Sequence, residues 1–571
     1  MTKSVKNGYL YVVDEQGTEQ CLCENIIVKK VKVNLVNGEH FLCLGLWSRG
    51  VPIEIEIPRS DLNRSIISKL MKYGLTLVDC AECTELLLEH LLESEMDAER
   101  TYFHEVRGYA TAADGTPVYL LHHPIGFSPD KSQSKSTFHR PEITAPVGTL
   151  DEWISDMEQH VIGRGNMELA LSLGACGQVF YILKKNHYLS DMPIIALVSK
   201  SSCGKTLSLR VMASLYGSPE ESGGLLNNFN CTENAFYAQM ESSYGLTLLF
   251  DELTSQSNSW DFAKLIYTIV AGNSKKRCNT HGGIEKDIQF FAPLVITGER
   301  SVLSSADKDM EGEHARVLEL RCRWTESAEH AETLEQVVRK NYGVAGPVLA
   351  QWIWNHEERI VEIYSTTIKK LNEQLDKCSN QYQGILRRKF KVVAGILTTA
   401  EILMEVFSFS LNLHKINEVL CSACFEQLPE QSPEEAAYDA VMALYAQNSY
   451  KFPQKVKRSM YANQQNLQIS GIWGERIDDR LWITEEKLKE VIEKKGFGDL
   501  RTIKRAWHEA GLIRRDGQRH YVFSHQLNGV YVKCSCLTIK EDVKSTSDMY
   551  EEISERVKNK DRVIALITGE D

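Results

Sequence analysis

A loop from Ser199 to Thr206 has the residue types that bind nucleotide phosphates. It fits the pattern G-x-x-x-x-G-K-[ST] at every defined position except the first, where Ser199 replaces glycine. Successive backbone N–H groups at a helix start would wrap the β-phosphate, and Gly204 would let the backbone approach closely. Lys205 would neutralise the β- and γ-phosphates, and the Thr206 hydroxyl would coordinate Mg²⁺. The candidate nucleotide-binding residues are Ser199, Ser201, Ser202, Cys203, Gly204, Lys205 and Thr206.

Two carboxylates end an apolar run downstream of this loop. Asp251 and Glu252 follow Leu246 to Phe250, and Asp251 lies 46 residues after Lys205. Asp251 would hold the Mg²⁺ through water, while Glu252 would orient and deprotonate the attacking water. A Gly-Lys-Thr at a helix start, or an Asp-Glu pair in a solvated turn, is common by itself, but the combination is much rarer. Together they favour the binding and hydrolysis of ATP with Mg²⁺.

Two further polar residues lie at ends of predicted strands. Thr297 ends the apolar run that starts at Phe291, where a γ-phosphate sensor would lie. Arg316 stands immediately before Val317 to Leu320 and is a candidate arginine finger for a neighbouring subunit's γ-phosphate. A plain strand end and a surface ion pair are the structural alternatives, and Arg300 is a second candidate for the finger.

Short apolar runs alternating with helical patterns must position these residues. The run Ile194 to Val198 precedes the loop and a helix-compatible stretch, Leu207 to Leu215, follows it. Such alternation predicts a parallel sheet with helical crossovers. Beyond residue 330 the apolar spacing is helical, with helices predicted at 331–342, 344–371, 387–407 and 416–426. Before residue 150, β-branched runs and an Asn37-Gly38 turn predict a β-rich α+β region.

Composition restricts the class of protein. The chain has 571 residues, enough for three to five domains, and its 43% hydrophobic and 25% charged residues are typical of a well-cored globular protein. No window approaches the roughly 18 apolar residues that a membrane span needs, so we expect a cytoplasmic protein with no membrane partner. The formal net charge is −12, yet residues 451–520 contain 16 Lys/Arg against 10 Asp/Glu. Positive charge therefore concentrates near the C-terminus.

The motifs, in this order and followed by helices, resemble the AAA+ ATPases that form ring-shaped motors. With Thr232-Glu233-Asn234, Gly272 to Arg277 and Thr297-Gly298-Glu299, they look more closely like an uncharacterised-domain family of mobile genetic elements. Its better-understood members are replicative helicases of chromosome cassettes and genomic islands, similar to minichromosome-maintenance helicases. The resemblance implies a homo-hexameric DNA helicase that works beside other replication proteins. It also implies a second sensor near Arg388, with Arg387 as a rival.

The predicted fold class is α/β, with an AAA+ phosphate-loop core and a helical lid between a β-rich α+β domain and a winged helix. The predicted divisions are an N-terminal α+β domain (1–100), a β-containing connector (101–149), the ATPase core (150–330), the helical lid (331–445), a winged helix (446–536) and an acidic tail (537–571).

A basic segment between the acidic pair and Thr297 is the first candidate for contact with DNA. It has a glycine turn, Gly282-Gly283, and we expect a hairpin. In the ring helicases that the chain resembles, a hairpin at this place projects into the pore and follows single-stranded DNA. A solvated basic loop is the alternative. The candidate phosphate contacts are Lys275, Lys276, Arg277, His281 and Lys286.

The second candidate is the predicted winged helix, which would bind duplex DNA. A helix from Leu500 to Ala510 would place basic residues on an outward face, and a hairpin around Asp516-Gly517 would form a basic wing. Winged helices that bind only protein are the alternative. The candidate DNA contacts are Arg501, Lys504, Arg505, Arg514, Arg515 and Arg519.

These features predict an ATP-driven DNA helicase or translocase. Two other functions fit the same residues. One is an ATPase that remodels or regulates DNA complexes without unwinding, and the other is a DNA-binding regulator whose imperfect loop no longer hydrolyses ATP.

Overall fold

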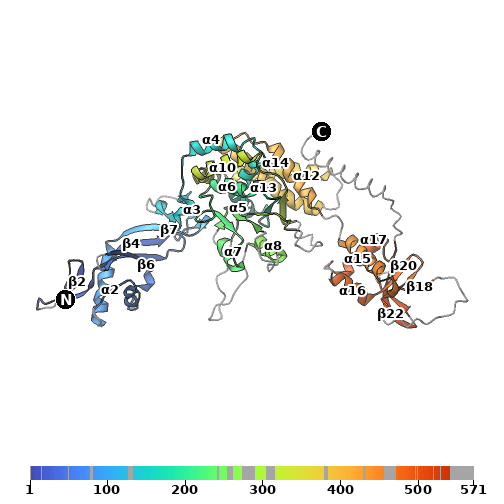
Figure 1. The fold of residues 1–571 in the computed structure, drawn as a ribbon, viewed down its shortest axis with the longest axis horizontal. Coiled ribbons are helices and arrows are strands. Elements are labelled where there is room, and N and C mark those ends of the chain that lie inside the picture. Colours follow the sequence, from blue (N-terminus) through green and yellow to red (C-terminus); the bar gives the residue numbers. More distant parts are fainter. Residues whose placement is uncertain are drawn as a thin grey trace.

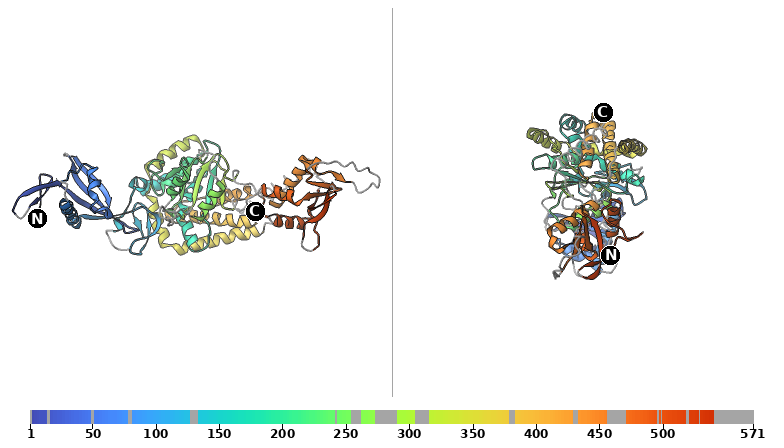
Figure 2. Two further views of the ribbon diagram at one scale, coloured as in Figure 1. Left: turned by 90° about the horizontal axis from the view of Figure 1, so that it is seen from below. Right: turned by 90° about the vertical axis from the view of Figure 1, so that its right-hand side faces the viewer.

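The computed structural model of the chain has three parts, arranged in chain order along its longest axis (Figure 1). A β-rich part lies at the N-terminal end, a larger α/β part lies in the middle, and a smaller mixed part lies at the far end, as the views in Figure 2 also show. The described residues are 2–13, 16–48, 51–77, 81–126, 133–240, 243–253, 262–272, 290–303, 315–377, 383–428, 433–455, 471–494, 497, 499–517, 520–527 and 529–539.

The N-terminal part is built on a five-stranded sheet in the order β11-β7-β4-β5-β6. The turn at Asn37-Gly38 joins β4 to antiparallel β5, and Gly38 has a φ of 73°, so the predicted hairpin is confirmed. Helix α2 packs on β4. The bounds are β4 (Ile26–Asn34), β5 (His40–Ser48), β6 (Val51–Pro58), β7 (Glu99–His104), β11 (Thr137–Phe138), α1 (Ile66–Met71) and α2 (Ala81–Met96). A smaller sheet of β1 (Thr2–Lys6), β2 (Tyr9–Val13) and β3 (Glu19–Glu24) precedes it.

A second, four-stranded sheet joins this part to the middle of the molecule. Its order is β10-β9-β8-β14, with β8 (Arg107–Thr111), β9 (Pro117–Leu120), β10 (Pro124–Ile125) and β14 (Ser243–Tyr244). Strands β7 and β8 are close in the chain but belong to different sheets. The predicted division at residue 100 falls inside β7, which pairs with β4 and β11.

The middle part contains a five-stranded sheet in the order β13-β15-β16-β12-β17, in which all neighbouring strands pair in parallel. All residues of β12, β15, β16 and β17 are buried, as expected for a parallel sheet covered on both faces. Successive residues of β12 alternate between two apolar clusters: Ile195 and Leu197 belong to one, and Ile194 and Ala196 to the other. The bounds are β12 (Ile194–Val198), β13 (Leu226–Asn228), β15 (Leu248–Asp251), β16 (Leu294–Gly298) and β17 (Val317–Leu320).

Helices cover the two faces of this sheet. Those contributing to the Ile195 cluster include α4 (Leu150–His160), α5 (Met167–Lys185), α6 (Lys205–Ser214) and α10 (Ala328–Lys340), and those of the Ile194 cluster include α7 (Glu233–Met240) and α8 (Phe262–Ala271). The short α3 (Pro141–Thr144) precedes them. The predicted parallel sheet with crossovers is therefore confirmed.

The helices predicted after residue 330 are present, with one difference. The predicted helix over 344–371 is two helices, α11 (Ala345–Asn355) and α12 (Glu357–Asp376), because the backbone leaves helical geometry at His356 (ψ 36°). Helices α13 (Gln383–Phe407) and α14 (Leu413–Glu426) follow. Gly395 lets α13 approach α5, since a Cβ there would lie 2.7 Å from the Phe180 ring.

Buried polar groups fasten these helices to β17. The Lys389 ammonium of α13 donates to Gln427 Oε1 over 2.6 Å, and the Glu319 backbone N–H of β17 donates to the same oxygen over 3.0 Å. Glu319 in turn accepts from the Ser301 hydroxyl (2.8 Å). Burial lowers the pKa of Lys389 to about 8. This cluster fixes the neighbouring turn of α13, which contains Arg388, against the sheet.

The C-terminal part has its own apolar cluster and a sheet in the order β18-β19-β20-β22-β21. Helix α15 (Pro433–Gln447) packs in this cluster with α16 (Glu485–Lys494) and α17 (Leu500–Glu509), whereas the predicted division at residue 445 assigns it to the lid. An amphipathic pattern shows that a helix is half-buried but not which core receives it. The strands are β18 (Gln454–Lys455), β19 (Gly474–Ile477), β20 (Arg480–Thr484), β21 (Phe523–Leu527) and β22 (Val530–Thr538).

A hairpin of this part lies later in the chain than the predicted wing. Strands β21 and β22 pair antiparallel, with Leu527 opposite Val530. At the predicted wing around Asp516-Gly517, the described residues contain an isolated antiparallel bridge between Asp516 and His520. Of the predicted acidic tail (537–571), Leu537 and Thr538 belong to β22, and residues from 540 onward lie outside the described residues. Among the described residues, no helix combines the length and the apolar character needed to traverse a bilayer.

Candidate functional site

The predicted strand–loop–helix is confirmed around residues 199–206. Strand β12 ends at Val198, α6 begins at Lys205, and Gly204 precedes the helix in the left-handed conformation (φ 85°). The Ser199 N–H donates to the Gly298 carbonyl of β16 over 3.3 Å, and the Trp324 N–H donates to the Cys203 carbonyl over 2.9 Å. Both ends of the loop are thus held by neighbouring chain, and its N–H groups lie at the positive end of α6.

Gly204 is required by both conformation and space. A Cβ at this position would lie 2.7 Å from Thr325 Cγ2 and 3.0 Å from Thr325 Oγ1. Left-handed backbone at a residue with a side chain costs about 1–3 kcal/mol even without such a clash. The replacement of the first motif glycine by Ser199 has no comparable consequence, since Ser199 is not among the residues with positive φ.

We therefore expect Gly204→Ala to weaken ATP binding strongly and to lower the thermal stability of the chain. The matched control is Gly223→Ala, because Gly223 also has a left-handed backbone (φ 71°) but its Cβ would meet only Glu142 Cγ at 3.6 Å. Thermal unfolding with and without ATP and Mg²⁺ would measure both effects. An ATP-dependent shift in the Gly204 variant equal to that of the control would contradict the assignment.

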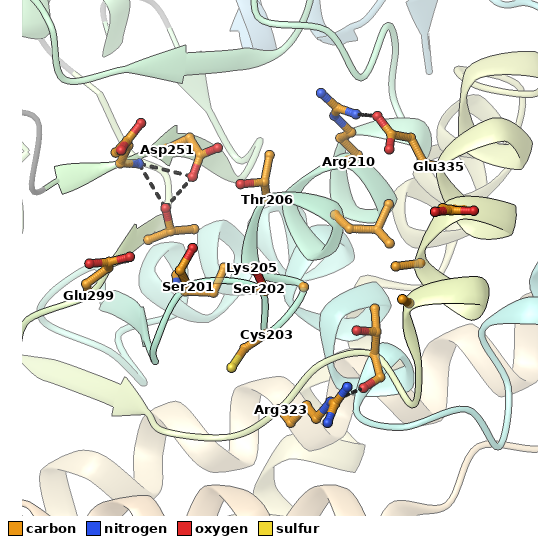
Figure 3. A pocket seen from close by; sticks show the side chains of 18 of the residues that line it. Ser201, Ser202, Cys203, Lys205, Thr206, Arg210, Asp251, Glu299, Arg323 and Glu335 are labelled. Carbon is orange, nitrogen blue, oxygen red and sulfur yellow. Dashed lines mark hydrogen bonds and ion pairs between the residues drawn. The ribbon is translucent and has the colours of Figure 1, made fainter.

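The side chain of Lys205 lies over the loop. Its ammonium donates to the carbonyls of Ser199 (2.7 Å) and Lys200 (2.9 Å), so it is held within the loop's curvature. Thr206 follows on the first turn of α6 and faces Asp251 (Figure 3). Lysine and threonine therefore lie where the pattern G-K-[ST] needs them to contact phosphates and a metal ion.

The two carboxylates and Thr297 meet at the carboxyl edge of the sheet. Strands β15 and β16 pair in parallel with Phe250 opposite Ile296, which brings the next residues, Asp251 and Thr297, side by side. The Thr297 hydroxyl donates to Asp251 Oδ1, and the Glu252 N–H donates to Thr297 Oγ1 over 2.9 Å. Figure 3 shows this triangle of hydrogen bonds beside the loop.

Glu252 has an unusual backbone. Its φ is 59°, in the left-handed region that glutamate rarely adopts, while Asp251 is buried (8% exposed) and Glu252 is exposed. The strand thus ends abruptly, and the two adjacent carboxylates point to different surroundings. Asp251 lies buried at the sheet edge, whereas Glu252 is exposed, and both line one cavity.

One cavity of about 770 Å³ joins these groups. Residues 201–206 form one wall, and Asp251, Glu252, Thr297 and Glu299 form another (Figure 3). The remaining wall comes from Arg323, Thr325 and helix α10, where Glu335 forms an ion pair with Arg210 of α6. Sequence motifs do not predict this last wall, because its residues follow β17 in the chain and lie near the loop only in the folded structure.

Arg316 and Arg388 do not line this cavity. They share a second cavity of about 340 Å³ at the amino ends of β12 and β17, at the opposite edge of the sheet from the loop. Arg388 therefore does not lie beside loop 199–206 of its own chain, because α13 passes the other end of the sheet. Arg387 forms an ion pair with Asp376. Arg316 lies 3.9 Å from Asp191 and stacks over Tyr267.

The candidate DNA contacts have mixed outcomes. Lys275, Lys276, Arg277, His281, Lys286 and Arg519 lie outside the described residues. Arg501, Arg505, Arg514 and Arg515 are exposed, and Arg514 and Arg515 stack over Phe523 and Tyr521.

Lys504 is not on the outward face that the sequence predicts. Its side chain is buried and its ammonium donates to both Glu485 oxygens of α16, over 2.7 Å and 2.6 Å. Burial lowers the pKa of Lys504, and the bonded carboxylate opposes that shift. The prediction of Lys504 as an exposed phosphate contact is wrong, because α17 packs this turn against α16.

Two family models match separate parts of this chain. Residues 5–289 match the family model described as a domain of unknown function (DUF927), and residues 432–542 match the model of the Cch helix turn helix domain. The second match includes α15, in agreement with the packing of that helix. A search of curated proteins gives no significant match.

Among solved structures, the chain is similar to one titled "SCCmec type IV Cch - active helicase". The two chains are 20% identical, the TM-score is 0.69, and the alignment covers 94% of this chain and 97% of the other. Nearly the whole molecule, from the β-rich part to the C-terminal part, therefore has the fold of that Cch chain.

Proposed function

We propose that this protein is an ATP-dependent DNA helicase or translocase with an AAA+ core, a homo-hexamer that replicates a mobile genetic element. One observation supports the ATPase most directly: Asp251, Glu252 and Thr297 form one hydrogen-bonded cluster that faces loop 199–206 across a single cavity. The similarity to a Cch helicase and the matched helix-turn-helix model support action on DNA.

The cavity residues fit ATP and Mg²⁺. The hydroxyl of Thr206 and the carboxylate of Asp251 are hard oxygen ligands of the kind that Mg²⁺ prefers, and both line the cavity. Thr206 and Asp251 would hold the Mg²⁺, which would supply positive charge to neutralise the charge that develops at the γ-phosphate. Lys205 and the loop N–H groups bind the β- and γ-phosphates. Glu252 accepts a proton from the attacking water, and the Thr297 hydroxyl fixes the position of the Glu252 backbone.

The second cavity supports an active site shared between subunits. Arg316 and Arg388 lie together, about a strand's length from the loop of their own chain, so they would reach a γ-phosphate only in a neighbouring subunit. Arginine charge at such an interface would stabilise the transition state after assembly. A ring is the assembly in which every loop receives such a pair.

Mixing two inactive variants tests this arrangement. Lys205→Ala and Arg316→Ala are each expected to abolish hydrolysis, whereas an equal mixture restores sites that take Lys205 from one subunit and Arg316 from the next. Random assembly predicts about a quarter of wild-type activity. The control mixture combines Lys205→Ala with Glu252→Gln, which lie on the same side of one site and restore none. Equal activity in the two mixtures would contradict a trans role for Arg316.

DNA contact is proposed at two places. Single-stranded DNA would follow the predicted hairpin with Lys275, Lys276, Arg277, His281 and Lys286 through the pore of the ring, and duplex DNA would bind the winged helix. The exposed Arg501 and Arg505 of α17, with Arg514 and Arg515, form the basic surface that supports the second contact.

The salt dependence of duplex binding tests the α17 surface. Arg501→Ala and Arg505→Ala together should weaken binding and lower the slope of log K against log salt by about 2, because each removes about one phosphate contact. Lys504→Met is the matched control within the same helix turn. Since Lys504 is bonded to Glu485, its replacement should leave the slope unchanged. A slope that falls with Lys504→Met but not with the arginine variant would contradict this surface.

ATP hydrolysis with and without single-stranded DNA, together with the mass of the nucleotide-bound assembly, tests the proposal as a whole. Hydrolysis that DNA stimulates, in an assembly of six chains, is the expected result. Hydrolysis without strand displacement would leave the first alternative, a remodelling or regulatory ATPase. No hydrolysis under any condition would leave the second, a DNA-binding regulator.

A further inference from the structure

A third cavity, of about 830 Å³, lies where the four-stranded sheet meets the middle part of the molecule. Five aromatic side chains from separate segments line it, and each is only partly buried: Tyr109, Tyr181, Tyr244, Phe291 and Trp354. A cavity with this many part-exposed aromatic rings differs from a packed core, where such rings are covered. It is therefore a candidate binding site.

The rings are arranged for stacking. Tyr109 and Tyr181 are nearly parallel (11°) with centroids 4.1 Å apart, and the Trp354 ring lies 6.1 Å from Tyr109 at an interplanar angle of 19°. Gly245 allows this packing, because a Cβ there would lie 3.0 Å from Tyr109 and 3.1 Å from Tyr181. A flat heterocycle placed against these faces would extend an existing stack.

Cations lie beside the rings. The Lys184 ammonium is 4.6 Å from the centroid of the Phe291 ring, and Lys185 is at the rim, 3.0 Å from Glu357. Burial lowers the pKa of Lys184, with Asp191 opposing the shift. Flat aromatic faces next to ammonium groups match the chemistry of a nucleobase with its phosphate.

The backbone of this cavity leads directly to the candidate active site. The Gly245 N–H donates to the Phe291 carbonyl over 2.7 Å, and Tyr119 donates to the Gly245 carbonyl over 2.8 Å. Gly245 lies six residues before Asp251, and Phe291 lies six residues before Thr297. Asp251 and Thr297 are the two residues that meet at the other end of β15 and β16. A ligand in the cavity would thus contact the entry to both strands of the hydrogen-bonded cluster.

We propose that this cavity binds unpaired bases of single-stranded DNA and that occupancy is transmitted along β15 and β16 to the nucleotide site. In a duplex, the faces of each base are covered by the neighbouring base pairs, so the bases cannot stack on these rings. The bases of an unwound strand can. The inference rests on the proposed function, because it supplies a place for the strand that a helicase or translocase holds.

Anisotropy of labelled oligo-dT with the full-length protein, without ATP, tests the binding step. Tyr181→Ala should weaken binding about tenfold, which is within the effect of losing one base–aromatic stack, and Tyr181→Phe should keep wild-type affinity because it retains the ring. A second pair, Trp354→Ala and Trp354→Phe, should behave in the same way. Wild-type affinity in both alanine variants would overturn the proposal.

Photocrosslinking identifies the occupant. Oligonucleotides with 5-iododeoxyuridine should crosslink to peptides that contain Tyr109, Tyr181, Tyr244, Phe291 or Trp354, and crosslinks only elsewhere would overturn the assignment. Thymidine monophosphate serves as a competitor at the same nucleotide concentration as the oligonucleotide. If it abolishes crosslinking, the cavity binds a free nucleotide rather than a DNA strand, and the proposal is overturned. If a bound protein prevents these peptides from crosslinking to DNA, the cavity is the site of a protein partner, and the proposal is overturned.

The hydrolysis readout separates this inference from the proposed function. Tyr181→Ala should hydrolyse ATP like wild type without DNA and should lose stimulation by DNA at wild-type saturating concentrations. Absence of ATP hydrolysis in the wild-type chain would refute the proposed ATPase. The crosslinks would still show whether the cavity binds single-stranded DNA. Full stimulation of the Tyr181→Ala variant would refute the coupling to the nucleotide site.

Discussion

Replacing Glu252 by glutamine is expected to lower ATP hydrolysis by about 10²- to 10⁴-fold, the usual contribution of a general base. The amide keeps the shape of the side chain but cannot accept the proton of the attacking water. The backbone N–H bond from residue 252 to Thr297 does not depend on the side chain, so the cluster should persist. ATP binding should therefore survive, and the variant should trap bound ATP. Steady-state hydrolysis and filter binding of ATP measure the two effects.

Glu332→Gln is the control for this experiment. Glu332 lines the same cavity from α10, on the wall opposite the sheet edge, and its neutralisation changes the charge of the cavity equally. It should retain most of the hydrolysis. A Glu332 variant that loses as much activity as the Glu252 variant would show that net charge, rather than a base at the end of β15, limits the reaction.

Lys205→Ala is expected to weaken ATP binding by about 10- to 100-fold and to remove hydrolysis. A hydrogen bond to a charged group contributes about 1.5–3 kcal/mol, so this factor corresponds to the net loss of one contact between the Lys205 ammonium and a phosphate. The control is Lys200→Ala, because Lys200 belongs to the same loop but its side chain is exposed and does not line the cavity. Calorimetric titration with a non-hydrolysed ATP analogue measures the difference. Equal losses in both variants would contradict a specific role for Lys205.

The parts of the candidate site that the sequence predicts are those fixed by local chemistry. The loop at 199–206 needs glycine, lysine and threonine at set spacings along one continuous segment. Asp251 and Thr297 end neighbouring buried strands, and because parallel strands present their carboxyl ends at one edge, their meeting follows from the strand pattern.

The parts that the sequence does not predict depend on packing between distant segments. Lys504 lies in the same helix turn as the exposed Arg501 and Arg505, so its spacing is that of an exposed basic residue. Only the folded position of Glu485, 19 residues earlier, shows that Lys504 is buried in an ion pair. Arg388 has the helix position of a sensor, yet the direction of α13 across the sheet places it beside Arg316. Periodicity gives the exposed and buried faces of a helix but not the neighbour that each face meets.

The separate apolar cluster of the C-terminal part has a consequence for how such chains diversify. Its members all lie between Ala436 and Ile539, so among the described residues no side chain of the middle part completes that interior. Recombination that exchanges everything after residue 432 would replace the C-terminal part and leave the middle part intact. Under the proposed function, such an exchange gives a mobile element a new DNA target while the ATPase stays the same.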